Sequence, residues 1–320
     1  MAGHASTLRV VIAALIGNLL ISLAKFVAFF LTASSAMLAE AFHSVADTGN
    51  QLLMLVGIRR EQKPPDAKHP YGYGKESYFW SFVVALSIFS LGAAFAFYEG
   101  SHKLLAIYAH GEREVGNQLA GIVVLGVSLV IEGMSFRVAM AEFKRSAGKS
   151  GLRKAVVESR SATIITVLFE DAAAVAGLAV ALVGVGLTAL TRNPVWDAMA
   201  TLIIGIILAV VAVFLGRMTK HLLIGQSASR ADEAAIAEAV KSVEGVVGIV
   251  ELRTLHMGAE FILLNLGVKF QDGLVTRELE AVIDAIEHRV KAAVPEVKRI
   301  FIEADSFKHA DAAAGGPTKA

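Results

Sequence analysis

The sequence contains no cysteine and few charged residues. Only 18% of its 320 residues are Asp, Glu, Lys or Arg, against roughly 25% in typical soluble domains. Without cysteine the chain has no disulfide, no iron–sulfur cluster held by thiolates and no thiolate metal site, so any metal ion must be bound by histidine, carboxylate or neutral oxygen atoms. The formal net charge is +1, and this balance provides no strongly basic surface, so nucleic acid is not an expected partner.

Apolar residues are abundant, at 55% of the chain with a mean hydropathy of +0.60. A helix needs about 20 mostly apolar residues to cross a bilayer. Lys and Arg gather in the loops after the second and fourth apolar stretches, which places both termini in the cytoplasm. We therefore expect a six-helix transmembrane domain over residues 1–220, embedded in lipid and, in a bacterium, in the inner membrane. The six predicted spans are 9–32, 36–58, 78–100, 118–140, 161–189 and 195–216.

The composition changes after residue 220, where short amphipathic patterns replace the apolar stretches. Ser229 is the expected N-cap of the helix "ADEAAIAEAVKSVEG", and Thr276 that of "TRELEAVIDAIEHRVKAAV". With the strand patterns "VVGIVELRTLHM", "EFILLNLGVKF" and "VKRIFIEAD", the order αββαβ predicts a cytoplasmic α+β, ferredoxin-like domain over residues 226–306. An apolar face left uncovered in so small a domain favours homodimerisation. Residues 307–320 have too little apolar content to pack and are predicted to be disordered.

Five carboxylic acids lie at least four residues inside the ends of the predicted spans, where each ionised group costs about 2.5–3.5 kcal/mol. They must be neutralised, paired, hydrated or bound to a cation. His43 and Asp47 are four residues apart, so they project from one helix face and offer a nitrogen and an oxygen to a divalent cation. The alternative is a structural polar network in which Lys25 and Arg137 pair with the acids. The acids are Glu40, Asp47, Glu132, Glu170 and Asp171.

Four segments together resemble the cation diffusion facilitator family of divalent-metal transporters. They are "LAEAFHSVADTGNQLL" in the second span, "PDAKHPYGYGKES" in the loop after it, "FEDAAAVAG" in the fifth span and "NPVWDAMATLIIG" leading into the sixth. The last two are most similar to the mitochondrial-type zinc transporter branch of that family. The resemblance covers nearly the whole chain, and it includes the αββαβ order of the cytoplasmic domain.

The resemblance implies a metal site built from the second and fifth spans. In this sequence it falls on His43, Asp47 and Asp171. The family's fourth position is Val167, which has no ligand atom, so Glu170, a water molecule or Thr166 must take its place. Glu132 is an additional intramembrane acid, available as an alternative ligand or as a proton carrier.

The loop after the second span matches a secondary metal site of some family members only in part. Asp66 and His69 are present, but Tyr73 stands where a third ligand, histidine, is expected, so a weak or absent site is predicted. The histidines of the cytoplasmic domain are dispersed, so a tight binuclear site is not expected there.

The resemblance implies a secondary transporter, not an enzyme, that moves Zn²⁺ out of the cytoplasm in exchange for protons. No permanently bound cofactor is expected, and the homodimer would form through both the transmembrane and the C-terminal domains. A site of nitrogen and oxygen ligands also suits Fe²⁺, Mn²⁺ and Co²⁺, so the metal stays open. A non-transporting scaffold or metal sensor is the second reading. An intramembrane metalloprotease is disfavoured because the sequence has no HExxH motif.

Overall fold

The computed structural model describes residues 2–32, 35–110, 118–147 and 161–304, although the side chains of residues 35–43 lie outside that description. The chain divides into two compact units. The first contains Met1–Pro64 and Glu76–Lys220, and the second contains Pro65–Lys75 and His221–Ala320. The loop between the second and third predicted spans therefore belongs to the second unit.

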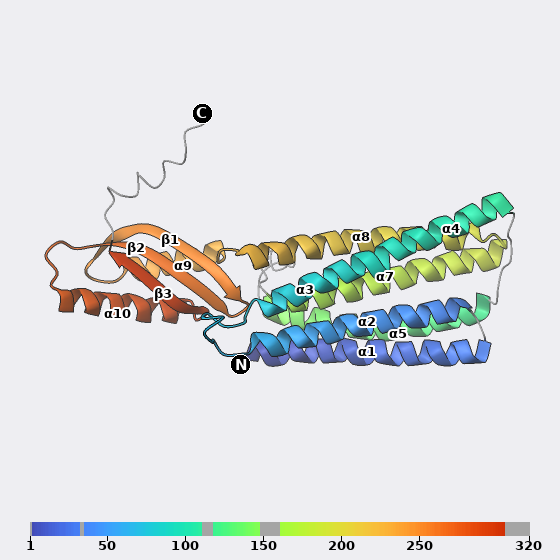
Figure 1. Cartoon of the computed structure of the whole chain (residues 1–320), viewed down its shortest axis with the longest axis horizontal. Helices are drawn as coiled ribbons and strands as arrows, with labels where there is room; N and C mark the ends of the chain where they lie inside the picture. The colour runs from blue at the N-terminus through green and yellow to red at the C-terminus, as the bar shows by residue number, and fades with distance from the viewer. Residues whose placement is uncertain (1, 33–34, 111–117, 148–160, 305–320) are drawn as a thin grey trace, which may run out of the picture. The chain divides into compact units, whose positions relative to one another are not determined.

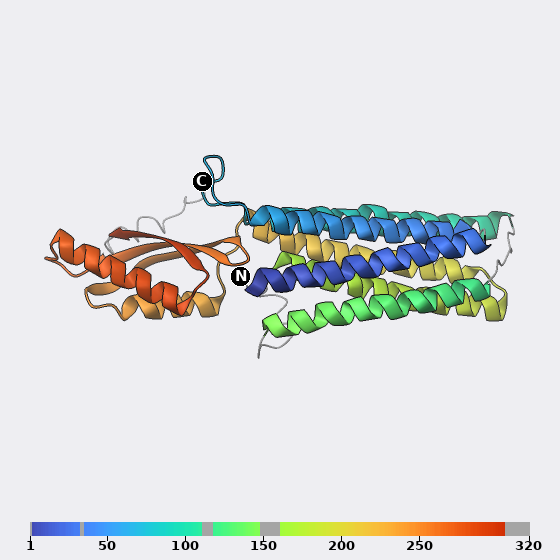
Figure 2. The ribbon, with the colours of Figure 1, turned by 90° about the horizontal axis from the view of Figure 1, so that it is seen from below.

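Long helices make up the first unit and run side by side along most of its length (Figures 1 and 2). Helix α2 packs against α1 and α3, and α5 packs against α1 and α7. Helix α3 continues through the π-helical segment η1 into α4. The elements are α1 (Ala2–Thr32), α2 (Ser35–Glu61), α3 (Glu76–Ser87), η1 (Ile88–Ala94), α4 (Phe95–His110), α5 (Gln118–Ala147), α7 (Ala162–Thr191) and α8 (Val195–Ile224).

All six predicted spans are helical. Within the residues that the structure describes, four helical segments are long and apolar enough to cross a membrane. They are Glu76–Ala109, Gly121–Arg145, Ala162–Thr191 and Val195–Ile224. Within the described residues, length and composition thus support these four of the six expected spans. Helix α1 includes the shorter apolar segment Val11–Ala24 among the described residues, and α2 carries polar residues from Glu40 to Gln51.

Apolar side chains fill the half of the bundle at which α1 begins and α8 ends. Because lipid is as apolar as these side chains, close packing and not transfer from water holds them together. This apolar half lies directly beside Glu170 and Asp171, since Ile164, Ile165, Val167 and Leu168 belong to it. Its other buried members are Val11, Met54, Ile58, Val84, Ala85, Ile88, Ala139, Phe143, Ala212 and Leu215.

The second unit has the predicted order αββαβ. Strands β1 and β2 pair antiparallel, and β3 pairs parallel with β2, which gives a sheet of order β1-β2-β3. Helices α9 and α10 cover one face, because their buried residues pack against alternate residues of β2. The elements are α9 (Arg230–Lys241), β1 (Val246–Gly258), β2 (Phe261–Phe270), α10 (Thr276–Ala293) and β3 (Val297–Ala304).

One of the two helix starts of this unit differs from the prediction. The Ser229 hydroxyl accepts a hydrogen bond from the Asp232 backbone N–H at 3.1 Å, as expected of an N-cap. The cap of α10 is Val275, not Thr276, because Val275 has the extended backbone of a cap while Thr276 is already helical. The Glu278 carboxylate accepts the Val275 N–H at 3.1 Å and satisfies that end. The predicted disordered tail, residues 307–320, lies outside the described residues.

Candidate functional site

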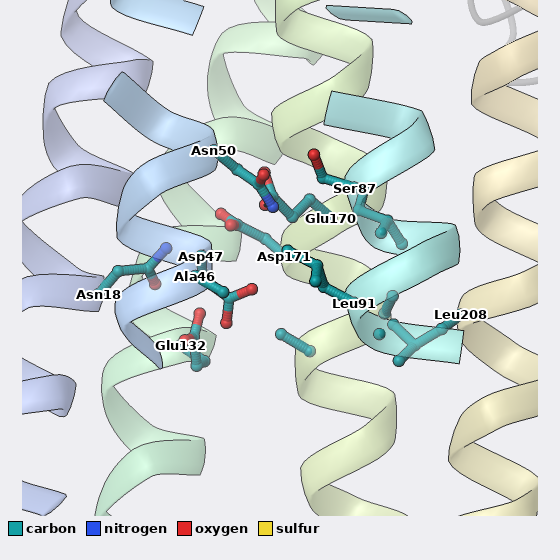
Figure 3. A pocket seen from close by; sticks show the side chains of 14 residues that line it. Asn18, Ala46, Asp47, Asn50, Ser87, Leu91, Glu132, Glu170, Asp171 and Leu208 are labelled. Carbon is teal, nitrogen blue, oxygen red and sulfur yellow. The ribbon is translucent and has the colours of Figure 1, made fainter. Parts of the chain in front are cut away.

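A cavity of about 50 Å³ lies inside the helix bundle, next to the apolar half (Figure 3). This volume holds a few water molecules or one partly hydrated ion. Four acids from three helices surround it, together with neutral polar groups from α1, α2 and α3. The polar lining residues are Asn18, Asp47, Asn50, Ser87, Glu132, Glu170 and Asp171.

Helix α2 presents three polar side chains toward this region because Asp47, Asn50 and Gln51 are spaced i, i+3 and i+4. The Asn50 amide donates to Oε1 of Glu170 at 3.1 Å, and the Gln51 amide donates to Oε2 at 2.9 Å. Both oxygens of Glu170 are therefore hydrogen-bonded across the α2–α7 interface. His43 lies one turn before Asp47 on the same helix, but its side chain is outside the described part of the structure.

The adjacent acids of α7 point to different neighbours, since successive residues of a helix are about 100° apart. Glu170 meets α2, whereas Asp171 meets α5, where the Ser135 hydroxyl donates to its Oδ2 at 2.8 Å. Both side chains are buried, at 8% and 2% exposure. Each carboxylate has about four lone-pair sites, so the bonds that orient these two acids leave oxygen lone pairs for a cation.

The remaining predicted residues separate into those that line the cavity and those that do not. Glu132 is buried on α5, one turn before Ser135, and lines the cavity. Thr166 and Val167 are fully buried in the apolar half and do not line it. Arg137 is exposed, and the side chain of Lys25 is not among those described. Among the described side chains, the donors to Glu170 and Asp171 are thus two neutral amides and a hydroxyl.

The acids surround the cavity without yet forming a closed metal site. Among the side chains that the structure describes, no three His, Asp or Glu residues converge closely enough to hold one ion. The cavity is also lined by Ile88, Leu91 and Gly92 of η1. A π-helical segment inside an α-helix often marks a functional site, and here it faces the acids.

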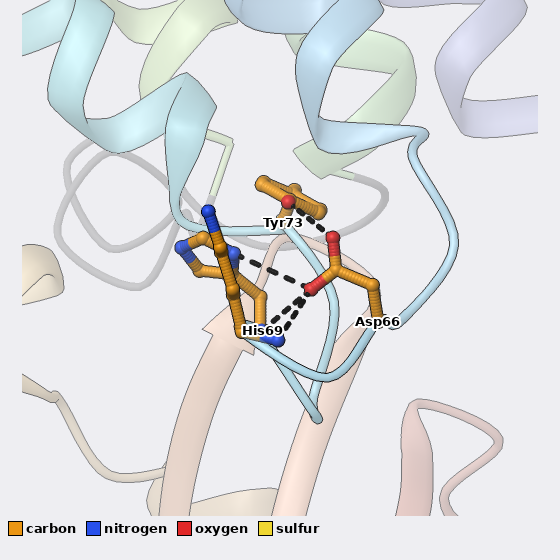
Figure 4. Close-up of polar contacts among 4 residues, drawn as sticks. Asp66, His69 and Tyr73 are labelled. Carbon is orange, nitrogen blue, oxygen red and sulfur yellow. Dashed lines mark hydrogen bonds and ion pairs between the residues drawn. The ribbon is translucent and has the colours of Figure 1, made fainter.

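The loop after α2 uses its candidate ligands to shape its own backbone (Figure 4). Oδ1 of Asp66 accepts the backbone N–H groups of Lys68 at 2.9 Å and His69 at 2.7 Å, and Oδ2 accepts the Tyr73 hydroxyl at 2.6 Å. The rings of His69 and Tyr73 have centroids 4.2 Å apart. Position 73 thus faces both candidate ligands.

The same hydrogen bonds change the acidity of Asp66. The Tyr73 hydroxyl, followed by the His69 backbone N–H, holds the pKa of the Asp66 carboxyl below its usual value. Because this pKa is lower in the folded loop than in the unfolded chain, ionised Asp66 stabilises the folded loop at any pH above the unfolded-state pKa. That stabilisation is lost as the pH falls through the lower, folded-state pKa. At neutral pH the Asp66 carboxylate is ionised and holds the loop.

A close approach of two backbones ties this loop to the hairpin of the second unit. A side chain at Gly74 would collide with the carbonyl oxygen of Met257, and the Cα atom of Gly258 lies 3.1 Å from the position a Cβ atom would take. The Lys75 amine donates to the carbonyl of Leu223 at 3.2 Å near the end of α8. These contacts explain why residues 65–75 group with the C-terminal elements.

Sequence reasoning missed the neutral side chains that orient the acids, namely Asn50, Gln51 and Ser135. The signal was present: Asn50 and Gln51 follow Asp47 by three and four residues, and Ser135 follows Glu132 by three. Polar residues repeated at helical spacing in an apolar helix indicate one polar face.

Buried acids around a cavity in a bundle of apolar helices define an integral membrane protein with an ion-handling site, because such acids are costly in lipid and face the bundle interior. The chain matches the cation efflux transmembrane domain over residues 11–224 and the cytoplasmic domain of cation efflux proteins over residues 228–307. It therefore belongs to the cation efflux family, whose members transport divalent cations.

Several named relatives are similar over most of this chain. Metal tolerance protein C4 of Arabidopsis thaliana is 31% identical over 84% of this chain and 58% of its own length. The mouse proton-coupled zinc antiporter SLC30A9, mitochondrial, is 34% identical over 84% of this chain and 47% of its own length. The magnetosome protein MamB of Magnetospira is 25% identical over 85% of this chain and 86% of its own. The chain thus spans about half the length of the first two relatives.

Proposed function

We propose that this protein exports a divalent cation, zinc in the first place, in exchange for protons. The observation that carries the proposal is the cavity inside the bundle, where Asp47, Glu170 and Asp171 line one space together with Glu132. A dication offsets the charge of two carboxylates, and protons offset it when the dication leaves, so the same acids serve both ions. The name of the mouse relative, a proton-coupled zinc antiporter, supports this choice.

In this proposal His43, Asp47, Asp171 and Glu170 bind the ion. Glu170 replaces the ligand that Val167 cannot provide, and it completes four protein groups, the usual number for zinc. Metal-bound carboxylates are themselves hydrogen-bonded in proteins. We therefore assign Asn50 and Gln51 as the groups that orient Glu170, and Ser135 as the group that orients Asp171. Glu132 lines the cavity as a proton carrier or an alternative ligand.

The transport cycle we propose uses six membrane helices with both termini in the cytoplasm. Helices α1 and α2 are included because they complete the cavity: Asn18 comes from α1, and Asp47 and Asn50 come from α2. The apolar half of the bundle closes the cavity toward the end at which α1 begins. Rocking of helices against each other would open that half and close the other one.

A second copy of the chain is the partner we propose, and lipid is the surrounding medium. The domain at residues 228–307 belongs to a class named for dimerisation, and one sheet face of the second unit is not covered by α9 or α10. The homodimer would form through this domain and the membrane helices together.

Uptake into proteoliposomes, measured metal by metal under an imposed pH gradient, tests the proposal. We expect Zn²⁺ to enter fastest, with Fe²⁺, Mn²⁺ and Co²⁺ as the competing substrates that an oxygen-rich site also accepts. A scaffold or metal sensor would bind metal but move none of the four ions, with or without the gradient. That outcome would refute the transport proposal and favour a scaffold or metal sensor.

A further inference from the structure

Three buried polar side chains lie just beyond the cavity, in the apolar half of the bundle. They are Gln51 of α2, Ser81 of α3 and Thr166 of α7, each at most 1% exposed. Oε1 of Gln51, the Ser81 hydroxyl and the Thr166 hydroxyl have no hydrogen-bond partner among the residues that the structure describes. Leaving a buried polar group unpaired is costly, so such groups usually have a partner, often a water molecule.

Four other hydroxyls of the bundle make the hydrogen bond that is usual for a helical Ser or Thr. Thr48, Ser87, Thr201 and Thr219 each donate to the carbonyl one turn back, at 2.7–3.1 Å. That local bond is the usual solution inside a helix. Thr219 is as deeply buried as Thr166, and its hydroxyl makes this bond to the carbonyl of Leu215. The hydroxyls of Thr166 and Ser81 do not make this local bond, which leaves them available to another partner.

The three side chains lie at levels of their helices close to that of the cavity. Gln51 is fixed there, because its amide donates to Oε2 of Glu170 at 2.9 Å. Thr166 is one turn from Glu170 on the same face of α7. Ser81 follows Trp80, whose Cβ atom lies 3.1 Å from the position of a Cβ atom at Gly57 of α2, and it precedes Ile88, which lines the cavity, by about two turns of α3.

We propose that Gln51, Thr166 and Ser81 bind water molecules that extend the cavity past Glu170 into the apolar half of the bundle. A buried water molecule needs two to four polar partners, and this arrangement provides an amide oxygen and two hydroxyls. Water next to hydroxyl groups conducts protons, so the same residues give protons a route that the metal ion, which needs charged ligands, does not share. This second role rests on the proposed antiport, whereas the water site itself does not.

The test compares Thr166→Val and Thr166→Ser in the full-length chain, with Thr219→Val as the matched control. Valine has nearly the same shape as threonine but removes the hydroxyl. If water binds there, Thr166→Val leaves that water short of a partner, and we expect the melting temperature to fall by about 2 °C or more below that of Thr219→Val. Thr166→Ser should retain the wild-type value. A melting temperature of Thr166→Val above that of the wild type would show an unhydrated hydroxyl and overturn the proposal.

Two measurements on the same variants test the proton route. Zinc affinity of Thr166→Val should equal that of the wild type, since Thr166 holds water and not the metal. Its proton-driven zinc uptake should slow several-fold and recover in Thr166→Ser, while Thr219→Val transports normally. Wild-type uptake in Thr166→Val would refute the proton route. If the wild type itself does not exchange zinc for protons, the antiport proposal fails, and the melting temperatures still decide whether the water site exists.

Discussion

Replacing Glu170 by glutamine tests whether this acid holds the metal ion. In the wild type, two amides donate to its carboxylate at 3.1 and 2.9 Å, and hydrogen bonds to a charged group contribute about 1.5–3 kcal/mol each. Glutamine keeps one acceptor oxygen, but its NH₂ group faces an amide donor and leaves one donor unpaired, at about 1–3 kcal/mol. Removing a charge from the membrane interior returns about 2.5–3.5 kcal/mol.

These terms offset each other to within a few kcal/mol, so we expect Glu170→Gln to remain folded. Its effect on metal binding should be much larger. Loss of even a group that orients a metal ligand lowers affinity about 10–100-fold, and loss of the ligand itself should cost at least as much. The assay is zinc titration of the purified full-length chain, followed by uptake into proteoliposomes.

Glu142→Gln is the matched control, because Glu142 is also a buried acid of the bundle but pairs with Arg145 at 3.2 Å and does not line the cavity. We expect its zinc affinity to be unchanged. Asp171→Asn should lose affinity as Glu170→Gln does. If Glu170→Gln binds and transports zinc like the wild type while Asp171→Asn does not, the ion is held without Glu170, and water completes its shell.

Two further predictions concern the loop and the soluble domain. Tyr73→His should add one zinc equivalent in calorimetry, because position 73 faces both Asp66 and His69 and a histidine there supplies a third ligand; an unchanged stoichiometry would contradict this geometry. Residues 226–306 alone should bind zinc only weakly, since no three His, Asp or Glu residues cluster in the described part of the domain; two ions bound well below micromolar would oppose it.

The sequence alone predicted those features that depend on local pattern. The strand β2 and the Ser229 cap are set by neighbours in the chain, and both are found where expected. The spacing of His43 and Asp47 also predicts one polar face of α2; Asp47 lines the cavity, whereas the side chain of His43 lies outside the described part of the structure. Each of these predictions needed only the period of a helix or a strand.

Features that depend on distant contacts were not predictable in this way. The donors that hold Glu170 come from residues 119 and 120 positions earlier in the chain, and no local pattern pairs them. The loop at residues 65–75 joins the second unit through the approach of Gly74 to Gly258. Helix α2 is less apolar than the other long helices, and two of its polar residues, Asp47 and Asn50, line the cavity.

The central claim is that the acids of the cavity exchange zinc for protons, and Asp47→Ala tests it most directly. Zinc and pH indicators inside the same proteoliposomes would record both fluxes at once. Asp47 lines the cavity. Replacing an acid inside the membrane with alanine relieves the cost of inserting its charge, so the variant should fold as a dimer. We predict that the wild type moves zinc and protons in opposite directions and that Asp47→Ala moves neither. Wild-type fluxes in Asp47→Ala would contradict the account.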